Sequence, residues 1–263
     1  MNNINATQES REIHLDTIRE GLGQYQGVAQ EFSVRSIKSR QTYDWLLNKH
    51  YAKRIPSISY AFGLYKDNNL IGVCTFGRPM AHLLIQNAFN GNYQESFLEL
   101  NRLCVNEDLP KNTLSHFVSK TLKMLPNNHV SVSYADSSQN HHGYIYQATN
   151  WIYTGLSVKF QDYMVKGYEH LHNASIMDMV TRSDKDGHVD KVKLLREKFG
   201  AENVYMKERP RKHRYFHFIG NKSQKRHMLK NLKYEIKPYP KGKNIRYDAS
   251  YKPITQRELF TTI

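Results

Sequence analysis

Cysteine is nearly absent from this chain of 263 residues, whose two cysteines are Cys74 and Cys104. Both lie within apolar stretches, where a cysteine usually serves as a small buried hydrophobe. They exclude a disulfide-rich scaffold and a zinc site built from several cysteines, and they indicate a reducing intracellular setting. No stretch approaches the roughly 18 apolar residues expected of a membrane-spanning helix. Because the polar N-terminus also lacks the pattern of a secretion signal, we expect a cytoplasmic protein without membrane contact.

Acidic residues are outnumbered, because 38 Lys and Arg face 24 Asp and Glu, which gives a formal charge of +14. Residues 205–246 hold most of this excess, with fourteen Lys and Arg against two Glu. Aromatic residues are interleaved with these cations, a composition typical of surfaces that bind the phosphates and bases of DNA or RNA. The alternative is a solvated helix face above core aromatics. We predict nucleic-acid contacts from Arg211, Lys212, Arg214, Lys222, Lys225, Arg226 and Lys230.

Apolar residues recur with the periods of both strands and helices. Strands are predicted at residues 32–37, 59–65, 70–76, 97–105, 130–134, 156–165 and 215–219. Helices are predicted at residues 39–49, 114–125, 189–199 and 222–233, with either a helix or a loop at 80–92. The residues Lys66 to Asn69 predict a hairpin turn, because Asn and Asp tolerate left-handed backbone angles. This succession predicts an α/β fold with a mixed central β-sheet flanked by helices, followed by a basic C-terminal extension.

Residues 99–155 contain the pattern in which we expect the chemistry. A strand, a helix and a second strand follow one another there, and two strands joined in this way pair in parallel or splay apart locally. The turn Leu109–Ser115 opens the helix, where free backbone amides favour an anion. Asp136 follows the second strand, and ligand sites of α/β sheets gather at such strand ends. The candidate site is therefore predicted between the helix start and this strand end.

Short motifs along residues 32–160 add a family resemblance. They are His50-Tyr51, Phe62-Gly63, Gly72 to Gly77, Glu99-Leu100-Asn101-Arg102, Leu109 to Thr113, Tyr134-Ala135-Asp136 and Gly143 to Ala148. In combination they resemble the Mom family of phage DNA-modification proteins, which look like enzymes of the acetyltransferase (GNAT) fold. The resemblance implies a GNAT-like mixed central β-sheet and a transferase that converts adenine in DNA to N6-carbamoylmethyladenine, which protects phage DNA from host restriction. It also implies double-stranded DNA as partner, no obligate protein partner, and the cytoplasm of an infected or lysogenic bacterial host.

The resemblance further implies an acyl-CoA donor, with acetyl-CoA as the first choice. The expected donor contacts lie on the strand and at the helix start: Leu103, Val105, Lys111, Asn112, Thr113 and Ser115. Acetyltransferases usually have a glycine-rich phosphate loop at this place, whereas Leu109–Ser115 contains no glycine. Donor binding is thus implied by the family and by the helix start rather than by a motif. Iron is a second suggested cofactor for the family, with His141 and His142 as potential ligands, although no ligand spacing here establishes a metal.

Five residues are candidates for the chemistry, and each has a structural alternative. Arg102 would orient the donor or an intermediate, or else form a structural salt bridge. Asp136 would take a proton from the adenine amine, or else cap the following turn. By the family match, Tyr146 would protonate the departing thiolate, and His50 would act as a base or metal ligand; the alternative for both is packing. Ser115 would contact phosphate or substrate, or else cap its helix.

The expected organisation has three parts. They are a flexible N-terminal arm at residues 1–30, a GNAT-like catalytic core at 31–166, and at 167–263 a helical insertion with a basic, DNA-binding strand and helix region packed on the core. Two other functions remain open from the sequence. One is an N-acetyltransferase of a small amine, a protein or RNA, and the other is a non-catalytic nucleic-acid-binding protein on a GNAT scaffold.

Overall fold

The computed structural model describes residues 31–242, apart from 108, 138–139, 172 and 181–189. The predicted flexible arm at residues 1–30 and the end of the basic extension, residues 243–263, lie outside the described residues. Within the described part of the chain, no helix is long and apolar enough to cross a membrane. Both cysteines are free and buried, which confirms their expected role as small core hydrophobes.

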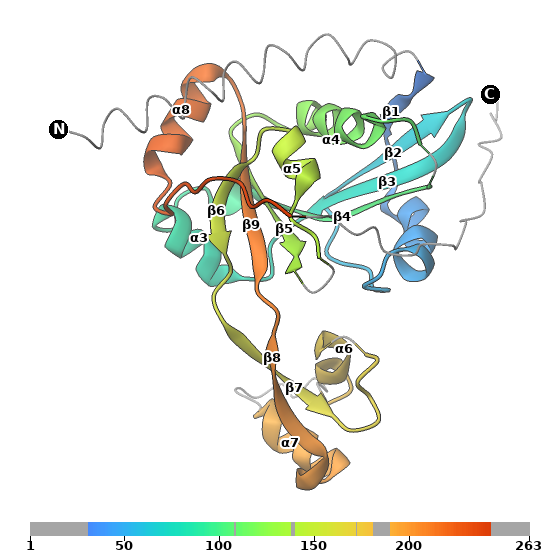
Figure 1. Ribbon diagram of the computed structural model, residues 1–263, viewed down its shortest axis with the longest axis vertical. Helices are drawn as coiled ribbons and strands as arrows, with labels where there is room; N and C mark the ends of the chain where they lie inside the picture. The colour runs from blue at the N-terminus through green and yellow to red at the C-terminus, as the bar shows by residue number, and fades with distance from the viewer. Residues whose placement is uncertain (1–30, 108, 138–139, 172, 181–189, 243–263) are drawn as a thin grey trace.

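Seven strands form the central sheet, in the order β1-β2-β3-β4-β5-β9-β6 (Figure 1). Their bounds are β1 Ser33–Ser36, β2 Tyr60–Lys66, β3 Asn69–Gly77, β4 Phe97–Val105, β5 His129–Asp136, β6 Ile152–Leu156 and β9 Lys212–Ile219. Neighbouring strands pair antiparallel except for β4 and β5, which pair in parallel. The mixed sheet flanked by helices confirms the predicted fold class. The hairpin turn between β2 and β3 is also confirmed, with left-handed φ angles of 48° at Asp67 and 62° at Asn68.

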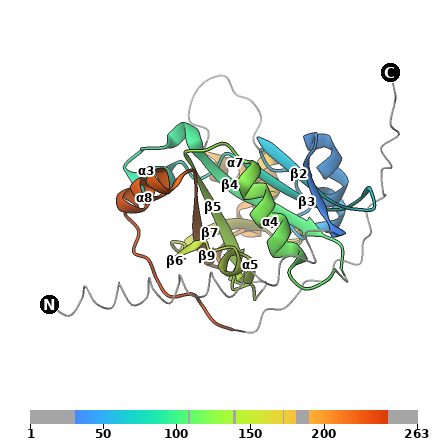
Figure 2. The same cartoon turned by 90° about the horizontal axis from the view of Figure 1, so that it is seen from above.

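The two faces of the sheet bury different helices. Val130 and Val132 of β5 belong to the core cluster of α3 and α8, whereas Ala135 belongs to that of α4 and α5, because side chains alternate along a strand. Figures 1 and 2 show α3 and α8 close together, with α4 and α5 away from them. The bounds are α3 His82–Phe89, α4 Thr113–Met124, α5 Tyr144–Ala148 and α8 Lys222–Asn231, which confirms the predicted helices at 114–125 and 222–233.

The α3 face is held by aromatic side chains. The ring of Phe89 lies 5.3–6.2 Å from the rings of Tyr93, Phe97, Phe216 and Phe218, each in an edge-to-face arrangement. Such pairs contribute roughly 0.5–1.5 kcal/mol each beyond the burial of their area. Phe89 of α3 thereby ties together β4 and β9, two strands that are not neighbours in the sheet.

The predicted helix at residues 39–49 is wrong in its type. A 3₁₀ turn covers Ser39–Thr42, and a π-helical turn follows at Trp45–Lys49. The wider turn is closed by the amide of His50, which donates to the carbonyl of Trp45 at 2.9 Å. The backbone of His50 is already extended, so this turn ends where the His50-Tyr51 pair begins. Single π turns of this kind are frequent at functional sites.

Residues 157–211 leave the central sheet and return to it, and we call them the hairpin extension. Its strands β7 Phe160–Val165 and β8 Val204–Arg209 form a separate two-stranded sheet. Helices α6 Asn173–Asp178 and α7 Lys191–Phe199 pack on it around a small core of their own. Figure 1 shows the extension projecting from the end of the sheet opposite to α8. The described part of the predicted helix at 189–199 is confirmed, since Asp190 caps α7 and Gly200 ends it.

Two strand predictions fail in the hairpin extension. The single strand predicted at 156–165 is wrong in its bounds, because β6 ends at Leu156 in the central sheet and β7 begins at Phe160 in the other sheet. Strand β8 was not predicted, because charged residues replace the apolar alternation after Met206. The pairing of β8 with β7 supplies what its sequence pattern lacks, including the ion pair between Arg209 and Asp162.

The chain after α8 covers the free edge of β6. The amide of Lys237 donates to the carbonyl of Tyr153 at 2.9 Å, and the Tyr239 hydroxyl donates to the carbonyl of Trp151 at 2.7 Å. These bonds hold residues 237–239 beside β6. Strand β9, which belongs to the basic C-terminal region, lies inside the sheet between β5 and β6.

Candidate active site

The parallel pair β4 and β5 separates soon after it forms. Its register covers three residue pairs and ends at Glu99 opposite Val132, after which β4 follows β3 and β5 follows β9. Beyond this point Ser133 connects the strands, because its Oγ donates to the carbonyl of Leu100 at 2.8 Å. Both alternatives that the sequence left open are therefore found, with parallel pairing at first and a local splay beyond it. The splay releases the backbone groups of β4 from strand pairing on the side that faces β5.

Glu99 lies at the point of divergence and was not among the predicted site residues. Burial raises the pKa of its carboxyl to about 7, although the nearby cations Arg102 and Lys212 act to lower that pKa. A carboxyl that titrates near neutral pH can accept a proton in a reaction, which makes it a candidate general base. One sequence feature could have pointed to it, because Glu99 is the single acid within the apolar strand Phe97–Val105.

Asp136 lies at the predicted strand end and has a cation beside it. The ammonium of Lys212, at the start of β9, is 3.2 Å from the Asp136 carboxylate, and the two residues are opposite each other in the β5–β9 register. The Asp136 side chain is largely buried. Lys212 therefore faces Asp136 and also acts on Glu99, so that one lysine serves both carboxyl groups.

His50 and Tyr51 approach the same carboxyl groups from the π-helical turn. Their rings stack with centroids 4.4 Å apart, and the amide of Ala52 donates to His50 Nδ1 at 3.1 Å. Burial, followed by the charges of Arg102, His141 and Lys212, lowers the pKa of His50 to about 3, so the ring is neutral at neutral pH. Because Nδ1 already accepts a hydrogen bond, the ring hydrogen is on Nε2. This arrangement makes His50 a hydrogen-bond donor and does not fit its predicted role as a base.

Tyr51 is a second protonated donor at this place. Burial and the nearby Asp136 carboxylate raise the pKa of its phenol to about 12, and Glu99 adds to the shift. The phenol therefore keeps its hydrogen throughout the neutral range. The predicted residues His50 and Asp136 are thus brought together around Tyr51, with the missed Glu99 beside them.

Arg102 holds its guanidinium among backbone carbonyls rather than in a salt bridge. One nitrogen donates to the carbonyl of Asn101 at 2.7 Å, and the other donates to the carbonyl of Arg54 at 3.3 Å. Its Nε is buried and has no hydrogen-bond partner among the described residues. Burial lowers the pKa of this side chain, yet a guanidinium keeps its charge in proteins. A buried cationic donor without a partner is suited to an oxygen of a ligand.

Tyr146 lies in the core beneath the divergence. Its ring is 5.2 Å from that of Trp151 and 5.1 Å from that of Tyr215, and its hydroxyl is 2.7 Å from Ser133 Oγ. Burial raises its pKa above the ordinary tyrosine value, so the hydroxyl is protonated at neutral pH. The ring of Tyr146 is therefore packed in the core, as its structural alternative proposed. Its hydroxyl contacts Ser133, the residue that connects β4 and β5.

The predicted donor residues gather at the start of α4. Asn112 adopts a left-handed φ of 72°, which turns the chain into the helix. Thr113 Oγ1 is buried and has no hydrogen-bond partner among the described residues, whereas the Ser115 hydroxyl donates to the Asn112 carbonyl at 2.9 Å. The Ser115 hydroxyl is thus bonded to the backbone at the start of its own helix, in agreement with a structural role. Leu103 and Val105 pack against the main core from β4, and Lys111 is exposed beside the helix start.

The predicted nucleic-acid contacts do not form one group. Arg211 and Lys212 lie at the site end of β9, where Lys212 is opposite Asp136. The four cations of α8 follow the other end of β9, which is roughly 24 Å away at about 3.4 Å per residue. They are all exposed, and they are Lys222, Lys225, Arg226 and Lys230.

Arg214 belongs to neither group, because it is only 6% exposed. Its guanidinium lies 3.5 Å from the ring centroid of Tyr234 and donates to the Thr154 hydroxyl at 2.9 Å and to the Thr154 carbonyl at 3.1 Å. The prediction that it contacts nucleic acid is not supported by this placement. Arg214 belongs to a run of basic residues, but it lies within strand β9, where alternate side chains point to opposite faces of the sheet, and its side chain is on a covered face.

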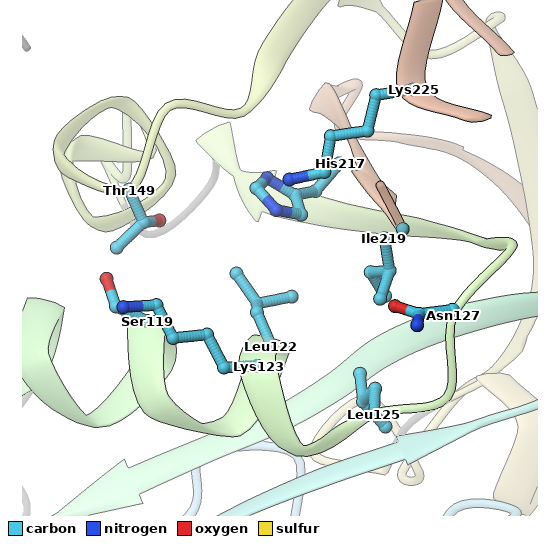
Figure 3. Close-up of a pocket in the computed structure, with 10 residues that line it drawn as sticks. Ser119, Leu122, Lys123, Leu125, Asn127, Thr149, His217, Ile219 and Lys225 are labelled. Atoms are coloured by element: carbon cyan, nitrogen blue, oxygen red, sulfur yellow. The ribbon is translucent and has the colours of Figure 1, made fainter. Parts of the chain in front are cut away.

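A pocket of about 330 Å³ lies near α8 and not at the diverging strands. Figure 3 shows His217 of β9 and Lys225 of α8 facing Ser119 and Leu122 of α4 across it. Burial and the Lys225 charge lower the pKa of His217 to about 4, so the ring is neutral. None of the predicted catalytic residues lines this pocket.

No group of three or more His, Cys, Asp or Glu side chains within the described residues could hold a metal ion. The sequence-based suggestion of iron, with His141 and His142 as potential ligands, therefore finds no support in that part of the chain.

Known structures of related shape are acetyltransferases. An N-acetyltransferase from Staphylococcus aureus Mu50 is 10% identical, covers 72% of this chain and 98% of its own, and superposes with a TM-score of 0.37. An acetyltransferase from Bacillus subtilis in complex with CoA is 12% identical, covers 71% of this chain and 96% of its own, with a TM-score of 0.33. Similarity at these scores supports no functional conclusion.

The sequence comparisons are more specific. The methylcarbamoylase Mom of Escherichia phage Mu is 26% identical over 249 residues, which cover 91% of this chain and 97% of that protein. The Mom protein family matches residues 31–241, and this range includes the central sheet, the hairpin extension and α8. Because the match extends over most of the sequence, the chain belongs to the Mom protein family.

Proposed function

We propose that the protein is a transferase that converts adenine in double-stranded DNA to N6-carbamoylmethyladenine and thereby protects phage DNA from host restriction. One observation carries the proposal. The buried Glu99 carboxyl, with a pKa of about 7, lies beside Arg102 and Lys212 where β4 and β5 diverge. Such a carboxyl suits the removal of a proton from an exocyclic amine. Membership of the Mom family and the name of the phage Mu relative, a methylcarbamoylase, support the group that is transferred.

An acyl-CoA is the proposed donor, with acetyl-CoA as the first choice. The start of α4 fits its phosphates, because a helix N-terminus favours anions and Thr113 Oγ1 is a buried hydroxyl without a partner there. Lys111 adds an exposed positive charge, and Leu103 and Val105 lie on the part of β4 beyond the divergence. A bound thioester supplies an acyl carbon that is activated for attack.

The protein's own residues would accept the proton and orient the reacting groups. Glu99 accepts the proton that leaves adenine N6 as the new bond forms, and Lys212 stabilises the carboxylates of Glu99 and Asp136. Arg102 offers its unpartnered Nε–H to an oxygen of the reacting group. Tyr51 and the Nε2–H of His50 are neutral donors that orient the base. Attack of N6 on the thioester carbon would release the CoA thiol and leave N6-acetyladenine. In the carbamoylmethyl product N6 is bonded to the methylene carbon and the carbonyl carbon carries an amide nitrogen, so an acetyl donor would have to act together with a nitrogen donor and a two-electron oxidant.

DNA is proposed to reach this site with the target adenine turned out of the helix, because its N6 has to approach buried groups. Of the predicted nucleic-acid contacts, Arg211 and Lys212 are the nearest to the site, and the α8 cations follow the far end of β9, a strand roughly 24 Å long. At about 3.4 Å per base pair, that distance corresponds to about seven base pairs. One bound duplex can therefore contact both ends of β9.

The experiment that tests the proposal is a nucleoside mass measurement on DNA from cells that express the protein. The expected result is a nucleoside with the mass of N6-carbamoylmethyladenosine in its deoxy form, together with resistance of that DNA to restriction enzymes. DNA that contains only unmodified adenine would overturn the proposal. A peak at the mass of the N6-acetyl nucleoside would instead assign a plain acetyl transfer.

A further inference from the structure

The hairpin extension starts directly beside the proposed active site. The amide of Ser157 donates to the carbonyl of Lys212 at 2.7 Å, and the amide of Lys212 donates to the Ser157 hydroxyl at 2.9 Å. Arg211 also donates to the Ser157 carbonyl, at 2.6 Å. Because Lys212 is opposite Asp136 on the next strand, Ser157 is two strand spacings from Asp136, or roughly 10 Å. The base of the extension is therefore fixed relative to the site.

Three apolar side chains are exposed in a row at this base. Leu156 is 36% exposed, Val158 is 75% exposed and Phe160 is 56% exposed. Leu156 ends β6 and Phe160 begins β7, so the three side chains lie within five residues at the point where the chain leaves the central sheet. Single exposed apolar residues are ordinary on a protein surface, but several within one short segment beside a site indicate a contact with another molecule. We call these three residues the apolar row.

Positive charge surrounds the apolar row. The Arg209 guanidinium lies over the Phe160 ring, 4.8 Å from its centroid, and is held there by its ion pair with Asp162. Lys159 is exposed between Val158 and Phe160, and Arg211 and Lys212 follow at the return strand. Two acids lie on the same hairpin: Asp162 pairs with Arg209, and Glu208 is exposed opposite Gln161. Apolar side chains with cations on both sides match the bases and the phosphates of nucleic acid.

We propose that the apolar row is a wedge that enters the base stack of duplex DNA next to the target adenine. This proposal rests on the proposed function, because it requires an adenine that leaves the helix. Extruding a base costs a few kcal/mol in lost pairing and stacking. Val158 and Phe160 fill the gap and restore apolar contact with the neighbouring bases, as wedge side chains do in proteins that kink DNA. Lys159, exposed between the two apolar side chains, contacts a phosphate beside the gap.

The test combines two measurements on the full-length protein and the variant Val158→Ala/Phe160→Ala. The first is the permanganate reactivity of thymines in a long duplex fragment, since permanganate attacks thymines that have lost their stacking. The second is the fraction of modified adenine in DNA from expressing cells. The wild-type protein should create reactive thymines, and the variant should lose them. The modified fraction should fall roughly ten-fold or more, because the energy of extrusion is no longer repaid.

Two further variants separate a wedge from a structural role. Phe160→Leu keeps a bulky apolar group, so most of the thymine reactivity seen with the wild-type protein should remain. Leu83→Ala removes an exposed apolar side chain from α3 and should change neither the thymine reactivity nor the fraction of modified adenine. All variants should bind DNA within about two-fold of the wild-type protein, since phosphate contacts supply most of that affinity.

The outcomes that overturn the wedge differ from those that overturn the proposed function. A wild-type protein that modifies adenine without creating reactive thymines would overturn the wedge alone, and so would an unchanged Val158→Ala/Phe160→Ala variant. A change of this variant from dimer to monomer in analytical ultracentrifugation, with reactivity retained, would assign the apolar row to a contact between two copies. Absence of any modified adenine with the wild-type protein would overturn the proposed function instead.

Discussion

The two ends of the central sheet carry their charges in opposite ways. At the site end, charged groups are buried or paired, and burial moves the pKa of Glu99 up to about 7 and that of His50 down to about 3. At the other end, the cations of α8 are exposed, and neither α8 nor α4 contains an acidic residue. Desolvation changes how readily a group exchanges a proton, whereas solvated cations keep their charge and attract a polyanion. We therefore expect the chemistry at one end and long-range attraction of DNA at the other.

The largest expected effect is at the site end. Glu99→Gln keeps the shape of the side chain but removes the proton acceptor, so the yield of modified adenine should fall by roughly 10²- to 10⁴-fold. The matched control is Glu95→Gln, which alters an exposed carboxylate paired with Arg78 on the same connection into β4. The measurement is the nucleoside composition of DNA from expressing cells. Equal yields from Glu99→Gln and the wild-type protein would remove Glu99 from the mechanism.

The same substitution should stabilise the fold at alkaline pH. The folded protein keeps a proton on Glu99 up to about pH 7, while the unfolded chain loses it near the ordinary glutamate pKa of 4.5. The unfolded state therefore binds fewer protons between these values, and stability falls as the pH rises through this window. Glu99→Gln abolishes that loss, so its free energy of unfolding at pH 8 should exceed that of the wild-type protein by up to about 3 kcal/mol. Urea unfolding at pH 4 and pH 8 measures it, and a stability gain that is equal at both pH values would contradict the burial of a titrating carboxyl.

Arg214 tests whether a cation in the basic region acts by packing or by binding. Arg214→Ala removes two hydrogen bonds to Thr154 and the contact with Tyr234, and the free energy of unfolding should fall by about 2 kcal/mol. Lys222→Ala, at an exposed position of α8, should leave stability within about 0.5 kcal/mol. Denaturant unfolding of both variants gives the comparison. If the Arg214→Ala protein is as stable as the wild-type protein but binds DNA more weakly, Arg214 contacts DNA rather than packing in the fold.

The α8 cations should have the smallest effect on the chemistry itself. Replacing all four by Gln should weaken DNA binding and flatten its salt dependence by about 0.9 in slope for each lost phosphate contact. The replaced residues are Lys222, Lys225, Arg226 and Lys230. Modification at saturating DNA should be unchanged, because these side chains follow the far end of β9, a strand roughly 24 Å long whose near end is opposite Asp136. Binding titrations between low and moderate salt measure the slope, and an unchanged slope would place the DNA elsewhere.

Local pattern was enough for much of the fold. The helix at 114–125 follows from its apolar period, and the parallel pairing of β4 with β5 follows from a short strand–helix–strand unit whose partners are close in sequence. The hairpin turn at Asp67 and Asn68 needs only residues that accept left-handed angles. Strand β8 was not predicted because its stability comes from pairing with β7, and its own sequence has no alternation of apolar residues that would indicate a strand.

The candidate site was predicted in part. Asp136 follows a strand end, to which strand order alone directs attention, whereas Arg102 was chosen because it belongs to the family motif. Glu99 was missed because its unusual pKa depends on burial by segments remote in sequence, including the π-helical turn and β9. Arg214 was placed on the surface because a run of cations does not reveal which ones the sheet turns inward. Net charge identifies a partner class, but only the three-dimensional arrangement separates structural cations from exposed ones.

The position of β9 in the sheet has a consequence for biosynthesis. Strand β6 is joined to the sheet through β9, whose residues are made about 60 positions later. During translation β5 therefore waits with an open edge while the hairpin extension emerges, and Asp136 lacks Lys212 until β9 inserts. Pairings between such distant residues slow folding, because the loop has to close before its contacts stabilise it. A nascent chain that ends before β9 lacks Lys212, the cation beside both Asp136 and Glu99. We therefore expect no DNA modification until β9 has been synthesised.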